Sequence, residues 1–317
     1  MANNYFKVLR GGIHTTFQDN GFINKQHLGI TVGGAIDKNL YYLSNRILNN
    51  SLDLPTIEFC FQGPKLQLIS GKSRVVVTGN VLFNISTSQE TFRGIANKSY
   101  ILKKGDIIDI ISTIKSNYGY FSAEGGFKIK KEFGSCSTLT TSLIGGNEGK
   151  TIKDNQYLFL NNNAKNINSY IKYNIKEVTK FIRVIPGPQM NYFFPKEIIK
   201  FFKNPFKISN SFNRMGIRMI GNSCKAIKSH DIPSEGIIKG SIQVPGDGNP
   251  IVLMNDHPTI GGYPKIAIVI MADLSKIAQL PSGNEVNFQL ISLKNAEKIH
   301  KSKINDFNKI INIGNVM

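Results

Sequence analysis

The chain has 317 residues and a net charge of +18, from 39 Lys and Arg against 21 Asp and Glu, and 41% of its residues are hydrophobic. This length and apolar content indicate a globular protein that can bury a large core and form two domains. The lysines are dispersed among Asn and Ile, which argues against a nucleic-acid partner and favours small anionic substrates. The longest apolar run, Ile266 to Met271, is too short to span a bilayer, and three widely spaced cysteines indicate neither a disulfide framework nor a zinc site. We therefore expect a cytoplasmic protein with no membrane partner and no metal in this chain.

Short β-like runs, broken by Gly, Pro or Asn, dominate the sequence. Such runs of β-branched and aromatic residues predict strands that are half or fully buried. We expect strands at Tyr5–Leu9, Arg74–Thr78, Ile107–Ile111, Ile182–Ile185, Ile251–Met254 and Val286–Leu293.

Helical signals are confined to four places along the chain. Asp37 can cap a helix over residues 40–48, and Pro195 can open one over residues 196–202. Asp273 can cap a third over residues 274–280, and residues 294–311 predict a terminal helix. The Asn- and Lys-rich residues 161–173 are typical of a surface connection.

Strand-like segments recur in the same order on both sides of that connection. Phe6–Gly11 echoes Ile182–Gly187, and Leu102–Ile110 echoes Leu280–Phe288. Leu28–Gly34 echoes Met215–Gly221. We interpret these echoes as a tandem duplication of one β-rich unit, and we expect the same strand order in both halves. The expected domains are residues 1–170 and 171–317.

Residues 234–274 hold the densest set of candidate site residues. Polar side chains interrupt short apolar strands there, at strand ends and in Gly/Pro turns, where loops held by a rigid scaffold usually carry function. The polar residues of this segment include Glu235, Gln243, Asp247, Asn255, Asp256, His257, Thr259, Tyr263 and Lys265.

Lys265 is the strongest single candidate in this segment. Gly261 and Gly262 allow close approach of a ligand, and Pro264 fixes the chain before Lys265. On an exposed loop, this lysine could present a point charge to a carboxylate, phosphate or carbamate, with the Tyr263 hydroxyl beside it. The alternative is a solvated lysine at the start of a strand.

Other residues of the second half offer complementary chemistry. Asp256 and His257 place a carboxylate beside an imidazole, which suits proton transfer, although an incidental histidine in a capped turn is the alternative. Gln243 could read an amide or could simply face outward from its strand. Arg214 and Arg218 could together clamp an anion.

The segment GGNEGKT, residues 145–151, superficially resembles a phosphate-binding loop. A P-loop requires Gly five positions before its Gly-Lys pair, but Ile144 stands there, and no clear helical pattern follows Thr151. No biotin-attachment sequence is present either. We expect ATP to act only through a complex with other chains, and we expect no biotin attached to this chain.

Seven segments together carry a family resemblance. They are TTFQDNG, QHLGITVGGAID, YFSAEGGF, FGSCSTLTTSLIGG, IPGPQMNYF, FNRMGIRMIG and SEGIIKGSIQVPGDGNPIVLMNDHPTIGGYPKI. These segments resemble the carboxyltransferase-like family that includes urea amidolyase, allophanate hydrolase subunit 2, the C subunit of ATP-dependent 5-oxoprolinase and the Kip-antagonist proteins. The sequence departs from the family pattern at Phe22, Gly33 and Cys136, where Arg, Ser and Arg are usual.

The resemblance implies a mainly β fold with a few helices, built as two tandem cyclophilin-like β-barrel domains. It implies a tight complex with the 5-oxoprolinase B subunit, joint work with the A subunit, and ATP-dependent opening of 5-oxo-L-proline to L-glutamate. Carboxyl transfer from carboxybiotin to an amide such as urea, and non-catalytic antagonism of a kinase inhibitor, are the alternatives.

The resemblance also suggests roles for the candidate residues. Proton transfer would fall to Asp256 or His257, and Lys265 would hold an anionic oxygen. The substrate-binding candidates are Tyr263, Gly261, Gly262, Gln243, Arg214, Arg218, Glu235 and Asp37.

Overall fold

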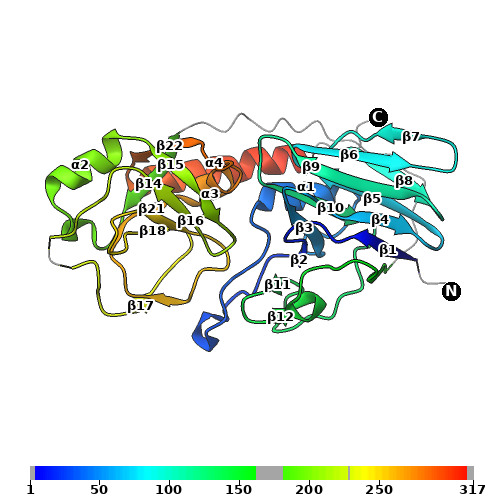
Figure 1. Ribbon diagram of the computed structural model, residues 1–317, viewed down its shortest axis with the longest axis horizontal. Coiled ribbons are helices and arrows are strands. Elements are labelled where there is room, and N and C mark those ends of the chain that lie inside the picture. Colours follow the sequence, from blue (N-terminus) through cyan, green and yellow to red (C-terminus); the bar gives the residue numbers. More distant parts are fainter. Residues whose placement is uncertain (1–3, 162–180, 228, 313–317) are drawn as a thin grey trace. The chain divides into compact units, whose positions relative to one another are not determined.

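The computed structural model describes residues 4–161, 181–227 and 229–312. In that part the chain is mainly β with four α-helices, as expected from the sequence (Figure 1). It divides into two compact units, of which the first holds residues 4–23, 33–161 and 308–312 and the second holds residues 24–32, 181–227 and 229–307. The expected domain boundary after residue 170 lies outside the described residues. No helix in the described part is long and apolar enough to cross a membrane.

The first unit consists of two antiparallel sheets and helix α1 (Lys38–Ile47). Side chains alternate along β5 (Lys72–Thr78), so that Val75 and Val77 join the core that both sheets share, while Val76 packs against α1. The strands of one sheet lie in the order β13 (Tyr157–Phe159), β1 (Tyr5–Arg10), β4 (Lys65–Leu68), β9 (Ile107–Thr113), β6 (Val81–Ser86) and β7 (Thr91–Arg93). Those of the other sheet lie in the order β2 (Thr16–Gln18), β3 (Thr56–Cys60), β10 (Tyr118–Ala123), β5 (Lys72–Thr78) and β8 (Ser99–Lys103). A separate two-stranded sheet is formed by β11 (Thr138–Leu139) and β12 (Ile144–Gly145).

The second unit is built on a closed barrel of seven strands (Figure 1). The barrel closes where β14 runs parallel to β22, and its other neighbouring strands are antiparallel. In order around the barrel the strands are β14 (Phe181–Pro186), β21 (Lys265–Val269), β18 (Ser241–Gln243), β19 (Ile251–Leu253), β16 (Gly216–Ile220), β15 (Phe206–Phe212) and β22 (Glu285–Leu290).

Helices and a two-stranded sheet complete the second unit. This small sheet pairs β17 (Glu235–Gly236) with β20 (Ile260–Gly261), and it places Glu235 opposite Gly261. The helices are α2 (Pro195–Lys203), α3 (Met271–Ala278) and α4 (Leu293–Asn312), of which residues 308–312 belong to the first unit.

The helix predictions are confirmed in position, with one correction. Asp37 caps α1 by accepting from the backbone N–H groups of Asn39 and Leu40, and Pro195 opens α2. The prediction that Asp273 caps α3 was wrong, because α3 begins at Met271. Buried Asp273 instead binds the Arg183 guanidinium, 2.6 Å away, and the Lys276 ammonium.

The predicted strand over Val286–Leu293 was too long. It ends at Leu290, and Leu293 already begins α4. Both segments are apolar, so composition alone did not separate the end of the strand from the start of the helix.

The prediction of equal strand order in the two halves was wrong. β1 lies between β4 and β13, both antiparallel to it, whereas β14 lies between antiparallel β21 and parallel β22. Residues 216–220 form β16, but their counterparts in Leu28–Gly34 form no strand. The echoes arose because every half-buried strand alternates apolar and polar residues, whatever its neighbours.

Candidate functional site

Lys265 is the first residue of β21, and only 3% of its surface is exposed. The expectation of an exposed loop lysine was therefore wrong. Lys265 belongs to the barrel wall itself and not to the Gly-Gly-Tyr-Pro loop that precedes it. A lysine that is this deeply buried requires a compensating charge.

Glu235 supplies that charge through an ion pair with Lys265 Nζ. Gln189 holds the pair together, because its Nε2 donates to Glu235 Oε1 at 2.7 Å and its Oε1 accepts from the Lys265 backbone N–H at 3.2 Å. The Gln189 backbone N–H also donates to the Lys265 carbonyl oxygen, at 3.3 Å. These bonds to Lys265 and Gln189 lower the pKa of Glu235, so the carboxylate is ionised at neutral pH.

Gln243 lies opposite Lys265 in the pairing of β18 with β21. Its side chain is buried, and its Nε2 has no hydrogen-bond partner among the described residues. A Cβ atom on Gly261 would lie 2.7 Å from that nitrogen, so a larger residue at this position would require the Gln243 amide to move. Lys265, Glu235, Gln243, Gly261 and Gln189 are thus gathered in one place, which we call the lysine site.

The remaining residues of the Gly-Gly-Tyr-Pro loop lie beside the lysine site in the chain. The Gly262 carbonyl oxygen accepts from the Ile232 backbone N–H at 2.8 Å, and this bond fixes the loop. Tyr263 is 40% exposed, so this residue of the loop faces solvent in part. Sequence reasoning missed Gln189; a polar residue directly after the turn of Ile185-Pro186-Gly187-Pro188 was the available signal.

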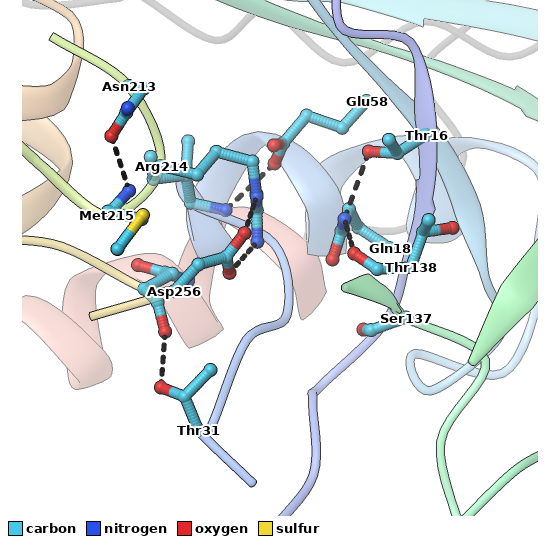
Figure 2. A network of polar contacts seen from close by, with 12 residues as sticks. Thr16, Gln18, Thr31, Glu58, Ser137, Thr138, Asn213, Arg214, Met215 and Asp256 are labelled. Atoms are coloured by element: carbon cyan, nitrogen blue, oxygen red, sulfur yellow. Dashed lines mark hydrogen bonds and ion pairs between the residues drawn. The ribbon is translucent and has the colours of Figure 1, made fainter. Parts of the chain in front are cut away.

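Arg214 and Asp256 form a second, separate arrangement in the same unit (Figure 2). Arg214 Nε and Nη2 each donate to one Asp256 carboxylate oxygen at 2.8 Å, a bidentate pair that is almost wholly buried. The Asp256 backbone N–H also donates to the Arg214 carbonyl oxygen at 2.8 Å. Arg214 was predicted to bind an anion and Asp256 to transfer a proton, but in the structure their side chains bind each other.

A hydrogen bond also fixes the backbone of the neighbouring Asn255, because its carbonyl oxygen accepts from the Thr31 hydroxyl at 3.1 Å (Figure 2). The strand-to-loop segment after β19 is therefore held from both sides, which keeps Asp256 and His257 in a fixed position.

His257 is buried and uncharged near neutral pH. Its Nδ1 lies 2.6 Å from the Pro258 carbonyl oxygen, and a carbonyl only accepts, so Nδ1 carries the proton and Nε2 keeps a free electron pair. Burial lowers the pKa of His257 from its ordinary value, and this outweighs the opposing effect of the bond to Pro258. An imidazole in this state can accept a proton at Nε2.

The lowered pKa predicts a pH-dependent stability that depends on His257. In the unfolded chain His257 takes up a proton below about pH 6.5, whereas in the folded chain its lowered pKa opposes protonation. The free energy of unfolding therefore falls as the pH drops below 6.5. His257→Gln should show a smaller loss of unfolding free energy between pH 7.5 and pH 5 than the unmodified chain, by urea titration. Equal losses in the two proteins would contradict the assignment.

Arg218 lies on β16 and forms an ion pair with Asp247. The pairing of β16, β19 and β18 places Arg218 and Gln243 on either side of Ile251. Arg218 therefore shares a face of the barrel wall with the lysine site, but both members of its ion pair remain partly exposed.

Asp37 lies in the first unit, where it is part of a buried network. Its side chain caps α1, and its backbone N–H donates to the Tyr120 hydroxyl at 2.8 Å. Tyr120 in turn donates to Glu58 at 2.7 Å, and Glu58 also accepts from the Ile36 backbone N–H. This geometry gives Asp37 a structural task in shaping the turn before α1.

Asp19 is a buried carboxylate in the first unit that sequence reasoning did not single out. It accepts from the Ser135 and Ser137 hydroxyls at 2.5 and 2.6 Å and from the Cys136 backbone N–H at 2.6 Å. Burial, with Asp19 nearby, raises the pKa of the Cys136 thiol to about 11, so Cys136 is protonated at neutral pH. The segments that contain Asp19 and Cys136 had contributed only to the family resemblance.

Comparison with known proteins identifies relatives along nearly the whole chain. It is 30% identical over 311 residues to the C subunit of 5-oxoprolinase from Escherichia coli, covering 96% of this chain and 97% of the relative. It is 32% identical to the C subunit of 5-oxoprolinase from Haemophilus influenzae, covering 90% and 91%. Urea amidolyase of Saccharomyces cerevisiae is 27% identical over 94% of this chain, which spans 17% of that protein.

A solved structure shares the fold. The crystal structure of the Kluyveromyces lactis urea amidolyase matches 96% of this chain with a TM-score of 0.85 and 25% identity, and the chain spans 20% of that protein. The carboxyltransferase domain family, described as subdomains A and B, matches residues 28–290. This chain therefore belongs to the carboxyltransferase domain family, subdomains A and B.

Proposed function

We propose that this chain acts as the C subunit of an ATP-dependent 5-oxoprolinase, which converts 5-oxo-L-proline to L-glutamate. Within the structure, the main support for this proposal is the lysine site. Lys265 provides a buried cation for the substrate carboxylate, and Gln243 Nε2 provides a donor for the lactam oxygen. The match to relatives named as 5-oxoprolinase C subunits, over almost their full length, supports the same assignment.

The chemistry divides between holding the lactam and opening it. 5-Oxoproline presents one carboxylate and one cyclic amide, which match one ammonium and one amide donor. Tyr263 can orient the ring from the exposed loop, and His257 Nε2 can accept a proton from the attacking water. ATP would activate the lactam oxygen through the complex with the A and B subunits, in a cytoplasm whose reducing conditions suit three free cysteines.

The test of this function is reconstitution. The purified chain should form a stable complex with a 5-oxoprolinase B subunit, and glutamate should appear only when both other subunits, ATP and 5-oxoproline are all present. A complete mixture that hydrolyses no 5-oxoproline would contradict the proposal.

The isolated chain is expected to hydrolyse no ATP and to form no glutamate. Residues 146–149 form a left-handed turn at Asn147 and Glu148, and the chain continues into strand β13, a geometry unlike a phosphate-binding loop leading into a helix. A coupled phosphate-release assay on the pure chain measures this. ATP turnover that follows the protein through successive purification steps would overturn the expectation.

Carboxyl transfer is the second candidate, because the family is a carboxyltransferase domain and urea amidolyases are among the relatives. Lys265 and Gln243 could equally hold a carboxylated amide. Carboxylation of urea in the presence of a carboxybiotin carrier, without glutamate formation from 5-oxoproline, would favour this candidate.

A further inference from the structure

Glu235 occupies the position on Lys265 that the carboxylate of a ligand would take. The Lys265 ammonium is buried, yet the Glu235 side chain that neutralises it is 44% exposed. Glu235 belongs to the two-residue strand β17, which pairs only with the equally short β20 in the described residues. The charge that balances the buried lysine is therefore provided by a half-exposed side chain on a two-residue strand.

The lysine site has donor capacity that Glu235 does not use. An ammonium group has three N–H bonds, and one carboxylate oxygen of Glu235 meets it. Gln243 Nε2 is a second buried donor, and it has no hydrogen-bond partner in the described chain. It lies next to Gly261, which has no side chain to fill the space beside it. Buried donors with unused hydrogen-bonding capacity are uncommon. Two of them at one place, Gln243 Nε2 and the Lys265 N–H bonds that Glu235 does not fill, favour a ligand with two or more oxygen atoms.

The support around Lys265 does not depend on Glu235. Gln189 binds the backbone of Lys265 through both its main-chain N–H and its side-chain oxygen. If the Glu235 side chain turned outward into water, Lys265 would keep this backbone support and would lose only its counter-charge. A carboxylate from solution could then replace that counter-charge.

We propose that Glu235 is a displaceable internal carboxylate, and that a carboxylate ligand binds Lys265 and Gln243 only after it displaces Glu235. This inference rests on the proposed function for the identity of the natural ligand, a carboxylate-bearing lactam. Glu235 is then an autoinhibitory contact, and the apparent affinity is the intrinsic affinity reduced by the fraction of chains in which Lys265 is open.

Glu235→Gln tests the competition directly, because glutamine keeps the size of the side chain and removes its charge. Calorimetric titration of the full chain, alone and assembled with the A and B subunits, should show about tenfold tighter binding of 5-oxoproline and acetate. Binding of 2-pyrrolidinone, which has the lactam but no carboxylate, should be unchanged. Acetate should also raise the Tm of the variant more than that of the unmodified chain, since Lys265 then lacks its counter-charge.

Glu148→Gln is the matched control, because Glu148 pairs with Lys150 on the exposed surface of the first unit. This variant should bind every ligand as the unmodified chain does. Unchanged or weaker carboxylate binding by Glu235→Gln would overturn the inference, as would the absence of carboxylate binding in both proteins.

The outcomes separate this inference from the proposed function. Glutamate formation by the assembled enzyme, with no gain in affinity in Glu235→Gln, would leave the function standing and remove the inference. A gain for acetate, in a chain whose complex never converts 5-oxoproline, would leave the inference standing and remove the function.

Discussion

Lys265→Ala is expected to lower kcat/KM of the assembled enzyme about 30- to 1,000-fold, or ~2–4 kcal/mol of transition-state stabilisation. The reason is that Lys265 provides a buried ammonium beside Gln243, where a charge-assisted contact is screened little by water. Glutamate formation by the reconstituted complex measures the effect. Lys265→Arg should rescue poorly, because a planar guanidinium does not replace a compact ammonium in this space.

The fold should survive the loss of Lys265, although the residue is buried. Glu235 is half exposed, so its carboxylate regains water when its partner is removed, and no charge is left buried without a partner. Lys150→Ala, which removes a lysine from a surface pair with Glu148, is the control and should leave turnover unchanged. Near-normal turnover by a folded and assembled Lys265→Ala protein would make Lys265 a structural residue. The search would then move to Arg214 and to residues 33–37.

Local signals in the sequence predicted the helices well. Asp37 and Pro195 act within one helical turn, so their effects depend on neighbours in the chain and can be read from it. Asp273 failed as a cap because a distant residue, Arg183, takes its carboxylate. From the sequence alone, an aspartate that caps a helix cannot be distinguished from one that balances a buried charge, because the difference lies in its tertiary partner.

The lysine site was predicted only in part. The sequence indicated Lys265, Gln243 and Glu235 because polar residues interrupt the apolar strands of residues 234–274, and loops held by a rigid scaffold usually carry function. It could not indicate that Gln189, 76 residues away, joins them, because that contact depends on how β14 and β21 pair. Burial of Lys265 was missed for the same reason: its ion-pair partner Glu235 lies on β17, and sequence periodicity does not reveal the pairing of β17 with β20.

The similar segments in the two halves of the sequence could not predict the order of the strands in each half. Alternation reports that a strand has one buried face, and it carries no information about which strands lie beside it. β14 and β1 have similar sequences, but one meets a parallel neighbour and the other does not. Register and strand direction are decided by the whole sheet.

Arg214→Ala is expected to lower the free energy of unfolding by about 3–5 kcal/mol, because it leaves the Asp256 carboxylate buried without its bidentate partner. Urea denaturation followed by far-UV circular dichroism measures the change. The double variant Arg214→Met, Asp256→Leu should lose much less stability, since no charge is then buried alone. Arg218→Ala, which breaks a half-exposed pair with Asp247, should change stability by less than about 1 kcal/mol.

The double variant also decides what the Arg214–Asp256 pair does. If it is stable and the assembled enzyme keeps its turnover, the pair serves only to fix the loop that carries His257. If it is stable and turnover is lost, the guanidinium or the carboxylate takes part in the reaction, because the scaffold has been preserved while the charges have gone. A single Arg214→Ala variant that unfolds as the unmodified chain does would show that the buried pair contributes nothing to stability, against the geometry of its two 2.8 Å bonds.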